Sequence, residues 1–492
     1  MKRTIIAVGT AAALGLVASA AHAVAYFGAG DTAHIPSGMA EATTLEQAAG
    51  GAGHMLFAPY FNVQGSNATS ISIVNTDTKN GKAVKVRFRG AANSDDVLDF
   101  TVLLSPGDVW TATMTQAADG RGELNTEDNS CTLPGFGPAY TLLDRMPTFL
   151  SEEAKAAQTR EGYIEVLNMA DIPSGSDLYK TIKHDASGTP SCSDLDDLLS
   201  LDELGGAAEA KDAGLAAPTG GLVGSWLIMN QEQYASFSGG MTAIRAIDDN
   251  GKNGYGLIAF TPQMPADYTG SKGIAEVTSD PLFVSGLQPL WFDLPDMSTP
   301  IVSAFDGDPA AQLAAMGLQH EKIMNEYVND SEGTVPMSTD WVVSQPTRRY
   351  YAAVLYGASA GTSGVFVTPG SSNPYAGAVT SSIQDGMPFA CIGGLTVSTT
   401  DREEKGTSVG AAWSPGASVT TCGEVFTLTF GKPSPLNAMI TNASVSPIAG
   451  KAGWGQIAPG RALPLVGFAA THALNQSSGI HYGMTLPHRW ND

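Results

Sequence analysis

Charged side chains are scarce in this 492-residue chain, and positive ones are the scarcest. Charged residues make up 15% of the sequence, and 26 Lys and Arg stand against 48 Asp and Glu, so the net charge is −22. The acidity therefore comes from a shortage of cations and not from dense negative charge. Phosphate backbones and anionic lipid surfaces repel a protein of this sign. The composition argues against nucleic acid as a partner and predicts a protein that attracts cations.

Cysteine is also rare, with four residues at Cys131, Cys192, Cys391 and Cys422. No C-x-x-C motif and no histidine at ligand spacing accompanies them, which argues against a metal site. Four oxidised cysteines allow three pairings. Their separation into an early and a late pair favours the disulfides Cys131–Cys192 and Cys391–Cys422.

A signal peptide is expected at residues 1–23, where an apolar run from Ile5 to Ala18 follows Lys2-Arg3. The small-residue close Ala21-His22-Ala23 is typical of a signal peptide cleaved after Ala23. The run is too short to remain as a membrane anchor, and no transmembrane segment is expected in the mature chain. We therefore expect a secreted, extracellular protein of the cell surface.

Glycine and proline punctuate the rest of the chain, where 56 Gly and 28 Pro separate short β-branched and aromatic runs. Short strands with turn residues between them are typical of a β-sandwich. The expected fold class is all-β, mainly an antiparallel β-sandwich or jelly-roll-like fold with minor helical segments. Strands are predicted at 55–63, 70–74, 84–88, 97–104, 109–114, 162–168, 222–229, 256–261, 341–344, 350–356, 364–368, 395–398, 425–430 and 438–445, and a short helix at 147–158.

The composition also predicts how the chain is organised. A flexible lead-in is expected at 24–53, a β-sandwich domain at 54–300, a helical bridge at 301–338 and a second β-rich region at 339–492. The first domain carries an expected insertion at 171–217, which is acidic from Asp194 to Glu203 and contains Cys192.

The helical bridge depends on one pattern, from about Pro309 to Val328. Asp308 is placed to cap this helix and Pro309 falls in its first turn. The apolar residues of the segment fall on one helical stripe: Leu313, Met316, Ile323, Met324 and Tyr327.

Two strands carry more specific expectations. From Lys82 to Arg89 the sequence alternates, and the face with Lys85, Arg87 and Arg89 is predicted to be a solvated cationic face. The run Met55–Val63 contains Pro59, which favours an edge position or a bulge. A core strand of the monomer is preferred for this run, and a donor strand that pairs with a neighbouring subunit is the alternative.

One motif imitates a hydrolase, since Gly357-Ala-Ser359-Ala-Gly361 matches G-x-S-x-G. A nucleophile elbow needs a helix directly after the serine, and another strand is predicted there. We therefore interpret the motif as a hairpin loop and expect no catalytic residues. His472, His481 and His488 are the candidate bases if Ser359 were a nucleophile.

Calcium is the one cofactor that the sequence leaves open, at Asp119, Glu123, Glu127 and Asp128. Oxygen-rich loops suit this hard cation, but the D-x-[DN]-x-[DN]-G spacing of an EF-hand is missing. A solvated acidic loop is the preferred interpretation of these carboxylates. Arg348-Arg349 and the stretch 401–404 are expected to form salt bridges that fix loop geometry.

Several strings resemble a group of exported bacterial cell-surface proteins of mostly uncharacterised function. These strings are LFAPYFNVQ with NATSISIVNTD (56–77), VKVRFRGAANSDDVLDFTVLLSPGDVWTA (84–112), EDNSCTLP (127–134), REGYIEVLNMA (160–170), GGLVGSWLIMN (220–230), NEYVND with TDWVVSQPTRRYY (325–351), DREE (401–404) and PHRW (487–490). The resemblance implies an exported, disulfide-bearing, β-rich surface protein, and it supplies no catalytic residues.

The leading functional hypothesis is a structural protein of a surface layer, sheath or extracellular filament, without catalytic activity. It would assemble with itself or with other surface components. The alternative is a surface module that binds a ligand or a glycan. An exported serine hydrolase using Ser359 is the third hypothesis.

Overall fold

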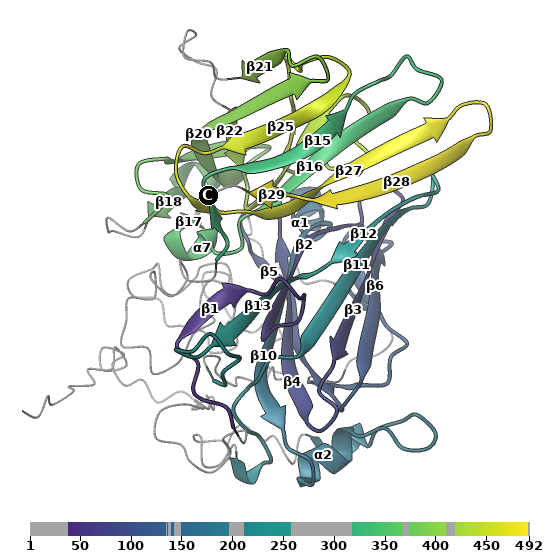
Figure 1. Ribbon diagram of the computed structural model, residues 1–492, viewed down its shortest axis with the longest axis vertical. Coiled ribbons are helices and arrows are strands. Elements are labelled where there is room, and N and C mark those ends of the chain that lie inside the picture. Colours follow the sequence, from purple (N-terminus) through teal and green to yellow (C-terminus); the bar gives the residue numbers. More distant parts are fainter. Residues whose placement is uncertain are drawn as a thin grey trace, which may run out of the picture.

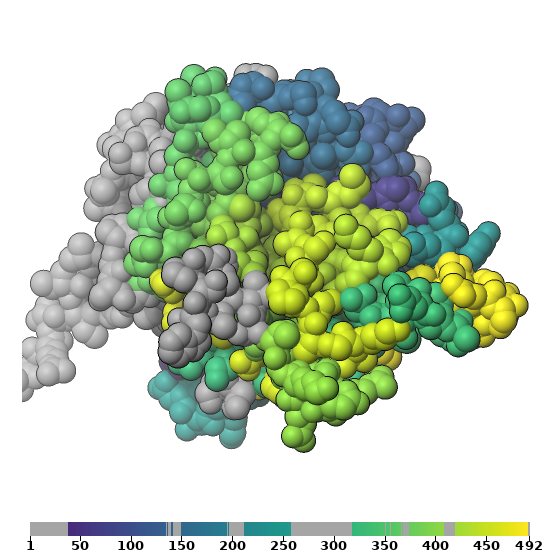
Figure 2. Space-filling model, turned by 90° about the horizontal axis from the view of Figure 1, so that it is seen from above, coloured from purple at the N-terminus to yellow at the C-terminus, as the bar shows by residue number. Residues whose placement is uncertain are grey.

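Two β-sandwiches make up the described part of the protein (Figure 1). The computed structural model describes residues 38–133, 135, 139–141, 149–195, 211–256, 317–367, 373–409 and 419–490. The first sandwich contains strands β1 to β13, and the second contains strands between β15 and β29 other than the small pairs β14–β26 and β17–β18. Seen from above, the second sandwich, green to yellow, fills most of the visible face, with blue and purple parts of the first behind it (Figure 2). The expected antiparallel all-β fold is confirmed.

The first sandwich pairs a seven-stranded sheet with a six-stranded sheet. In sheet order, the seven-stranded sheet holds β1 (Thr44–Gln47), β13 (Thr242–Ile247), β2 (Met55–Asn62), β10 (Glu161–Ile172), β4 (Gly81–Gly90), β5 (Asp96–Leu104) and β8 (Cys131–Leu133). The six-stranded sheet holds β12 (Ala235–Gly240), β11 (Leu222–Asn230), β3 (Asn67–Asn75), β6 (Val109–Gln116), β7 (Gly122–Asn125) and β9 (Ala139–Thr141). Alternation places Ile71 and Ile73 of β3 inside and Ser70 and Ser72 outside.

The second sandwich has the same two-layer plan, with one parallel pair. One sheet holds β19 (Val379–Gln384), β20 (Met387–Asp401), β25 (Ala452–Ala458), β15 (Ile323–Val328) and β29 (Arg489–Trp490), with β21 (Gly406–Val409) and β22 (Val419–Cys422) also on β20. The other holds β24 (Asn442–Ser444), β23 (Val425–Phe430), β16 (Met337–Ser344), β27 (Val466–Asn475) and β28 (Ile480–Pro487), and β23 and β24 run parallel. Trp341 lies fully buried between them, with its ring centroid 4.7 Å from that of Phe430.

Short elements complete the described chain. The helices α1 (Glu152–Gln158) and α2 (Asp177–Ile182) belong to the first sandwich, and both begin at a serine whose side chain accepts from a backbone N–H. The helical turn α7 (Arg348–Tyr351) leads into the hairpin of β17 (Ala352–Leu355) and β18 (Gly364–Val367). The pair β14 (Gln319–His320) and β26 (Leu463–Pro464) lies beside the second sandwich.

Both expected disulfides are confirmed. Cys131 of β8 is bonded to Cys192, which ties the segment after α2 to an edge of the seven-stranded sheet. Cys391 and Cys422 stand directly opposite each other on β20 and β22. Each disulfide therefore lies within one sandwich.

The expected helix at 309–328 is wrong over its described part. Residues 317–328 contain β14 and β15, whereas 309–316 lie outside the described residues. In β15 the buried residues are Ile323, Asn325 and Tyr327, which is the period of a strand. The apolar residues Ile323 and Tyr327 fit both a helical stripe and one face of a strand. Pairing with β25 and β29 decides for the strand.

The solvated cationic face predicted on β4 is also wrong. Lys85, Arg87 and Arg89 are at most 2% exposed. The register places Arg87 between Asp99 of β5 and Glu165 of β10. Arg87 also lies 3.1 Å from Asp96 and 3.4 Å from Asp99. Carboxylates on the neighbouring strands compensate the charge, so this face can be buried.

The run Met55–Val63 is a core strand, as preferred. Strand β2 lies between β13 and β10 of its own chain, and all its residues are buried. Strand β10 pairs along one edge of β2, and β13 pairs with Met55, Leu56 and Phe57 on the other. The donor-strand alternative stays a prediction. Pro59 lies opposite the irregularity in the β2–β10 register, between Gly162 and Ile164, where no ladder hydrogen bond is needed.

Candidate functional site

Buried polar groups join the two sandwiches at their contact, which we call the seam. Ser344 donates a hydrogen bond to the carbonyl of Pro59 across it. The backbone N–H of Glu424 donates to Ala91 O at 2.8 Å. The groups on both sides are buried. A polar seam of this kind fixes the two sandwiches in one orientation, because each buried polar group needs its partner.

The loop Ser434–Ile440 of the second sandwich, which we call the clasp loop, enters the first sandwich. The carbonyl of Leu436 accepts from Asn62 Nδ2 at 2.7 Å and from Asn67 Nδ2 at 2.8 Å. Glu161 of β10 accepts from the backbone N–H of Met439 at 2.7 Å. The first sandwich therefore binds the backbone of the clasp loop at Leu436 and at Met439.

Two buried carboxyl groups hold the clasp loop. Asp340 accepts from Thr429 Oγ1 at 2.6 Å and from Leu436 N at 3.0 Å. Burial raises the pKa of Asp340 to about 6, although these hydrogen bonds act in the opposite direction. Burial also raises the pKa of Glu161, against the hydrogen bonds from Met439 and Gln64.

A second cluster joins the sandwiches at Asp95. Arg349 lies 3.5 Å from Asp95 and donates to Ser94 O at 2.8 Å. Tyr356 donates to the other oxygen of Asp95, and Asn93 Nδ2 donates to Pro388 O at 2.7 Å. Arg348 lies 4.0 Å from Glu424. The salt bridges expected of Arg348 and Arg349 are thus confirmed, and Arg349 acts across the seam.

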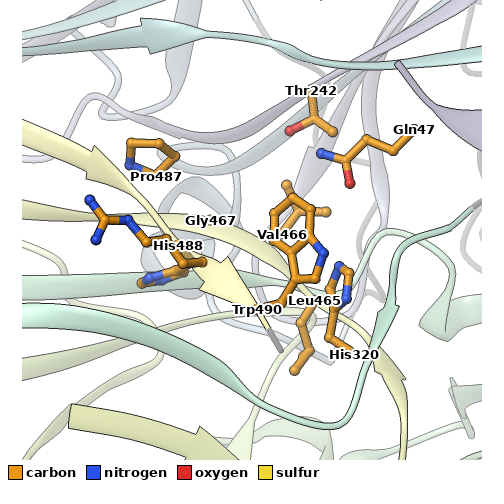
Figure 3. A pocket seen from close by; sticks show the side chains of 10 residues that line it. Gln47, Thr242, His320, Leu465, Val466, Gly467, Pro487, His488 and Trp490 are labelled. Carbon is orange, nitrogen blue, oxygen red and sulfur yellow. The ribbon is translucent and has the colours of Figure 1, made fainter. Parts of the chain in front are cut away.

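A pocket of about 460 Å³ opens where the two sandwiches meet (Figure 3), and we call it the junction pocket. The first sandwich contributes Gln47 of β1 and Thr242 of β13. The second side contributes His320, Leu465, Val466, Gly467, Pro487, His488, Arg489 and Trp490. Pockets of this size between two structural units, mostly apolar with a few polar groups, are typical small-molecule sites.

Trp490 is the central side chain of this pocket (Figure 3). Its backbone is held in β29, opposite Ile323 of β15. The indole stacks on the His320 ring, with 4.5 Å between centroids and 24° between planes. His320 is 3% exposed and Trp490 is 45% exposed. The indole of Trp490 therefore faces the pocket as a rigid aromatic surface, and the buried His320 ring packs against it.

His488 fixes the chain where it passes from β28 into β29. Its Nδ1 lies 2.9 Å from Asn325 Nδ2 and its Nε2 lies 2.9 Å from Val342 O. An amide donor at Nδ1 and a carbonyl acceptor at Nε2 fit the neutral ring. Burial lowers the pKa of His488 to about 4, so the ring stays neutral at physiological pH. His488 therefore positions Arg489 and Trp490 and is not a free base.

The chemistry of the junction pocket suits binding. The described residues that line it include no carboxylate, cysteine or serine. The apolar floor of Leu465 and Val466, the indole, and the polar groups of Gln47, Thr242 and Arg489 can hold a small molecule with an apolar face and polar edges.

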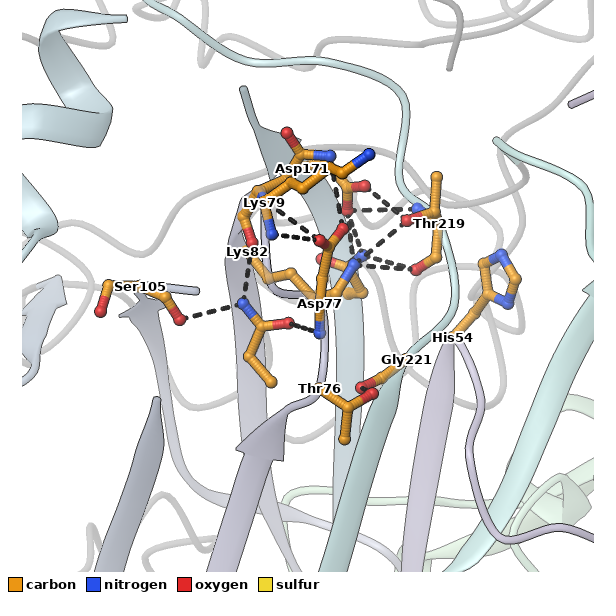
Figure 4. A network of polar contacts seen from close by, with 12 residues as sticks. His54, Thr76, Asp77, Lys79, Lys82, Ser105, Asp171, Thr219 and Gly221 are labelled. Carbon is orange, nitrogen blue, oxygen red and sulfur yellow. Dashed lines mark hydrogen bonds and ion pairs between the residues drawn. The ribbon is translucent and has the colours of Figure 1, made fainter. Parts of the chain in front are cut away.

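A further buried polar cluster lies at one end of the first sandwich (Figure 4). Lys82 Nζ lies 2.9 Å from Asp171, and Asn168 Nδ2 donates to Asp171 and to Thr219 O, both at 2.8 Å. Burial lowers the pKa of nearby His54 to about 4, and its Nδ1 accepts from Ala246 N at 3.1 Å. The cluster anchors residue 219 to β10 and β4 and has a structural role.

Ser359 lies in the turn of the β17–β18 hairpin, so the hairpin interpretation is confirmed. Its hydroxyl lies 3.5 Å from that of Thr362. His472 Nε2 lies 2.9 Å from His481 Nδ1. In the described residues no hydrogen bond connects Ser359 with a histidine.

The four carboxylates predicted as possible calcium ligands lie on the β6–β7 hairpin and in the segment after it. Asp119 binds Arg121, with Oδ2 2.7 Å from Nη2, and Glu123 belongs to β7. Asp128 accepts from Ser130 N at 2.8 Å, and Glu127 is exposed. Across the described ranges no three His, Cys, Asp or Glu side chains are grouped so that they could hold a metal ion. Calcium binding here stays a prediction.

Sequence reasoning did not find the junction pocket. Its residues come from parts of the chain as far apart as Gln47, Thr242, His320 and Trp490, and they share no motif. The closing Pro487-His-Arg-Trp490 string was the one available signal of a binding site, because it places an aromatic residue next to two basic residues.

Comparison of the chain with protein-family models, with curated proteins and with solved structures gave no match. Within the described residues, no helix has the length and apolar character needed to cross a membrane.

Proposed function

We propose that this protein is a non-catalytic, exported protein of the cell surface that binds a small neutral saccharide in the junction pocket. The half-exposed Trp490 indole, stacked on buried His320 inside a pocket, carries the proposal. The two disulfides are compatible with an exported protein. The pocket favours the binding alternative over the purely structural role.

The ligand class follows from the lining. A sugar ring offers an apolar C–H face to an aromatic side chain and hydroxyl groups to polar neighbours. The indole supplies the first surface, and Gln47, Thr242 and Arg489 supply donors and acceptors. A net charge of −22 disfavours anionic ligands, so a neutral monosaccharide or disaccharide fits best.

Titration calorimetry with neutral monosaccharides and disaccharides tests this proposal. We expect millimolar or tighter binding by the wild-type protein and at least a roughly tenfold loss in Trp490→Ala, because most of the stacking surface is removed. Trp454→Ala is the matched control, since Trp454 is 46% exposed but lies on β25 outside the pocket. Circular dichroism establishes that both variants fold.

Two results would contradict the proposal. Undiminished saccharide binding by Trp490→Ala would exclude the junction pocket as the site. No binding of any neutral saccharide by the wild-type protein would exclude the ligand class.

A structural role in surface assembly is the second candidate, and one observation favours it. The outer face of the six-stranded sheet has a central area without charged residues, although the chain is strongly acidic. Copies of an acidic protein approach each other most easily through such a surface.

A further inference from the structure

Three rows of residues form the centre of the outer face of the six-stranded sheet, which we call the hydroxyl face. The register of β11, β3 and β6 aligns Ser225, Ser72 and Thr111 in one row. The next row holds Leu227, Ser70 and Thr113, and the row on the other side holds Val223, Val74 and Val109. Burial alternates along all three strands, so these residues point away from the core.

None of these nine residues carries a charge. Outward positions of a sheet that faces water are usually polar and often charged, because that face is solvated. Here the positions hold hydroxyl and aliphatic side chains in a chain with a net charge of −22. A shallow groove of about 860 Å³ extends over the face toward Asn125, Thr126 and Glu127.

The hydroxyl groups are partly satisfied within the face itself. Ser72 Oγ lies 2.9 Å from Ser225 Oγ, and Ser70 Oγ lies 2.8 Å from Thr113 Oγ1. A hydroxyl that keeps a partner loses less free energy when water is removed. The valine row adds apolar area, and Val109 is 44% exposed. The face can therefore be covered at low cost.

We infer that the hydroxyl face is the contact surface of a symmetric dimer of this chain. A two-fold contact through the hydroxyl face brings the same uncharged rows of both copies together. A contact through an acidic part of the surface would instead bring like charges together. The nine residues include no aromatic side chain on which a sugar ring could stack, and several of their hydroxyls already pair. A second copy therefore fits this face better than a saccharide does.

The inference rests on the assembly role and is independent of the junction pocket. Sedimentation equilibrium of the mature protein should show a reversible dimer that strengthens with added salt, because salt screens the net repulsion. Thr111→Lys and Ser225→Lys each place a positive charge on the hydroxyl face. In the dimer this charge would face either the same lysine of the second copy or an uncharged row of it. We expect each to weaken dimerisation at least about tenfold.

Ser398→Lys is the matched control, because Ser398 is an outward residue of β20 on the second sandwich, between Val397 and Thr399 of its core. We expect it to dimerise like the wild type. A monomer at all protein concentrations would overturn the inference, as would equal weakening by Ser398→Lys. Loss of polysaccharide binding in Thr111→Lys without any change in association would identify a glycan as the occupant and overturn it as well. Failure of the saccharide titration at Trp490 would leave the dimer test unaffected.

Discussion

At the scale of single residues, the unusual property of this protein is the number of buried ionisable groups that hydrogen bonds or opposite charges satisfy. Arg87 lies near two aspartates, and Arg349 lies near Asp95. Asp340 and Glu161 accept hydrogen bonds from hydroxyl, amide and backbone donors. Burying such groups costs free energy. Their pairing also fixes the arrangement of the strands and loops that carry them, because a misplaced partner leaves a charge in an apolar environment.

Asp340 makes the stability of the protein depend on pH. Its pKa is 3.8 in its ordinary environment and about 6 in the folded protein, so the folded state binds the proton more tightly. The stabilisation is complete below pH 3.8 and is lost as the pH rises through about 6, which corresponds to roughly 3 kcal/mol. Asp340→Asn should lack this part of the pH dependence.

Urea unfolding of both proteins below, within and above this pH range measures the difference. Comparison with Asp340→Asn removes the contribution of the exposed carboxylates, such as Asp119 and Asp330, whose pKa values are lowered by hydrogen bonds. Parallel stability curves for the two proteins would show that Asp340 does not titrate in this range.

At the scale of elements, local sequence patterns predicted strands well where side-chain alternation and turns agreed. Strands β2, β5 and β23 begin and end within a residue or so of their predicted bounds. The failure at 317–328 has a physical cause, because Ile323 and Tyr327 suit a helix and a strand equally and pairing with β25 lies outside the local sequence. The charged face of β4 failed similarly, because Asp99 and Glu165 approach it only in the folded sheet.

The same limit explains the junction pocket. Each of its walls comes from a different part of the chain, so the sequence offers no signal for it apart from the closing Pro487-His-Arg-Trp490 string. The cysteine pairs were predictable, because the partners lie close enough in sequence for their clustering to be visible.

The two disulfides should stabilise different elements. Their sequence separations of 61 and 31 correspond to about 4 kcal/mol each on the chain-entropy model. Cys192→Ser should increase hydrogen exchange in α2 and the segment after it, whereas Cys422→Ser should increase it in β20 and β22. Exchange measured by mass spectrometry separates the two effects. Faster exchange in both sandwiches for either variant would show that the disulfides do not act locally.

At the scale of the whole molecule, the seam makes two sandwiches into one unit. The buried apolar residues of both sandwiches form one continuous cluster, and the clasp loop is bound by both. Cooperative unfolding follows, because neither sandwich can separate without exposing apolar area and buried charges.

Arg349→Ala tests this coupling, since it removes the cation that lies 3.5 Å from buried Asp95 across the seam. We expect a loss of about 3 to 5 kcal/mol, because removing one partner of a buried pair leaves an uncompensated charge. Arg121→Ala is the control, as its pair with Asp119 is solvent-exposed and should be worth under about 1 kcal/mol. Calorimetry should show one transition for the wild type. Two separate wild-type transitions, or equal losses in both variants, would contradict the coupling.

The junction pocket combines β1, the first strand of the described chain, with β29, the last. A chain that has folded only its first sandwich therefore lacks the Trp490 wall. The pocket is therefore complete only after both sandwiches have folded and docked. A fragment that ends before β29 would keep Gln47 and Thr242 and lack the Trp490 wall, so the complete pocket indicates that both sandwiches are in place.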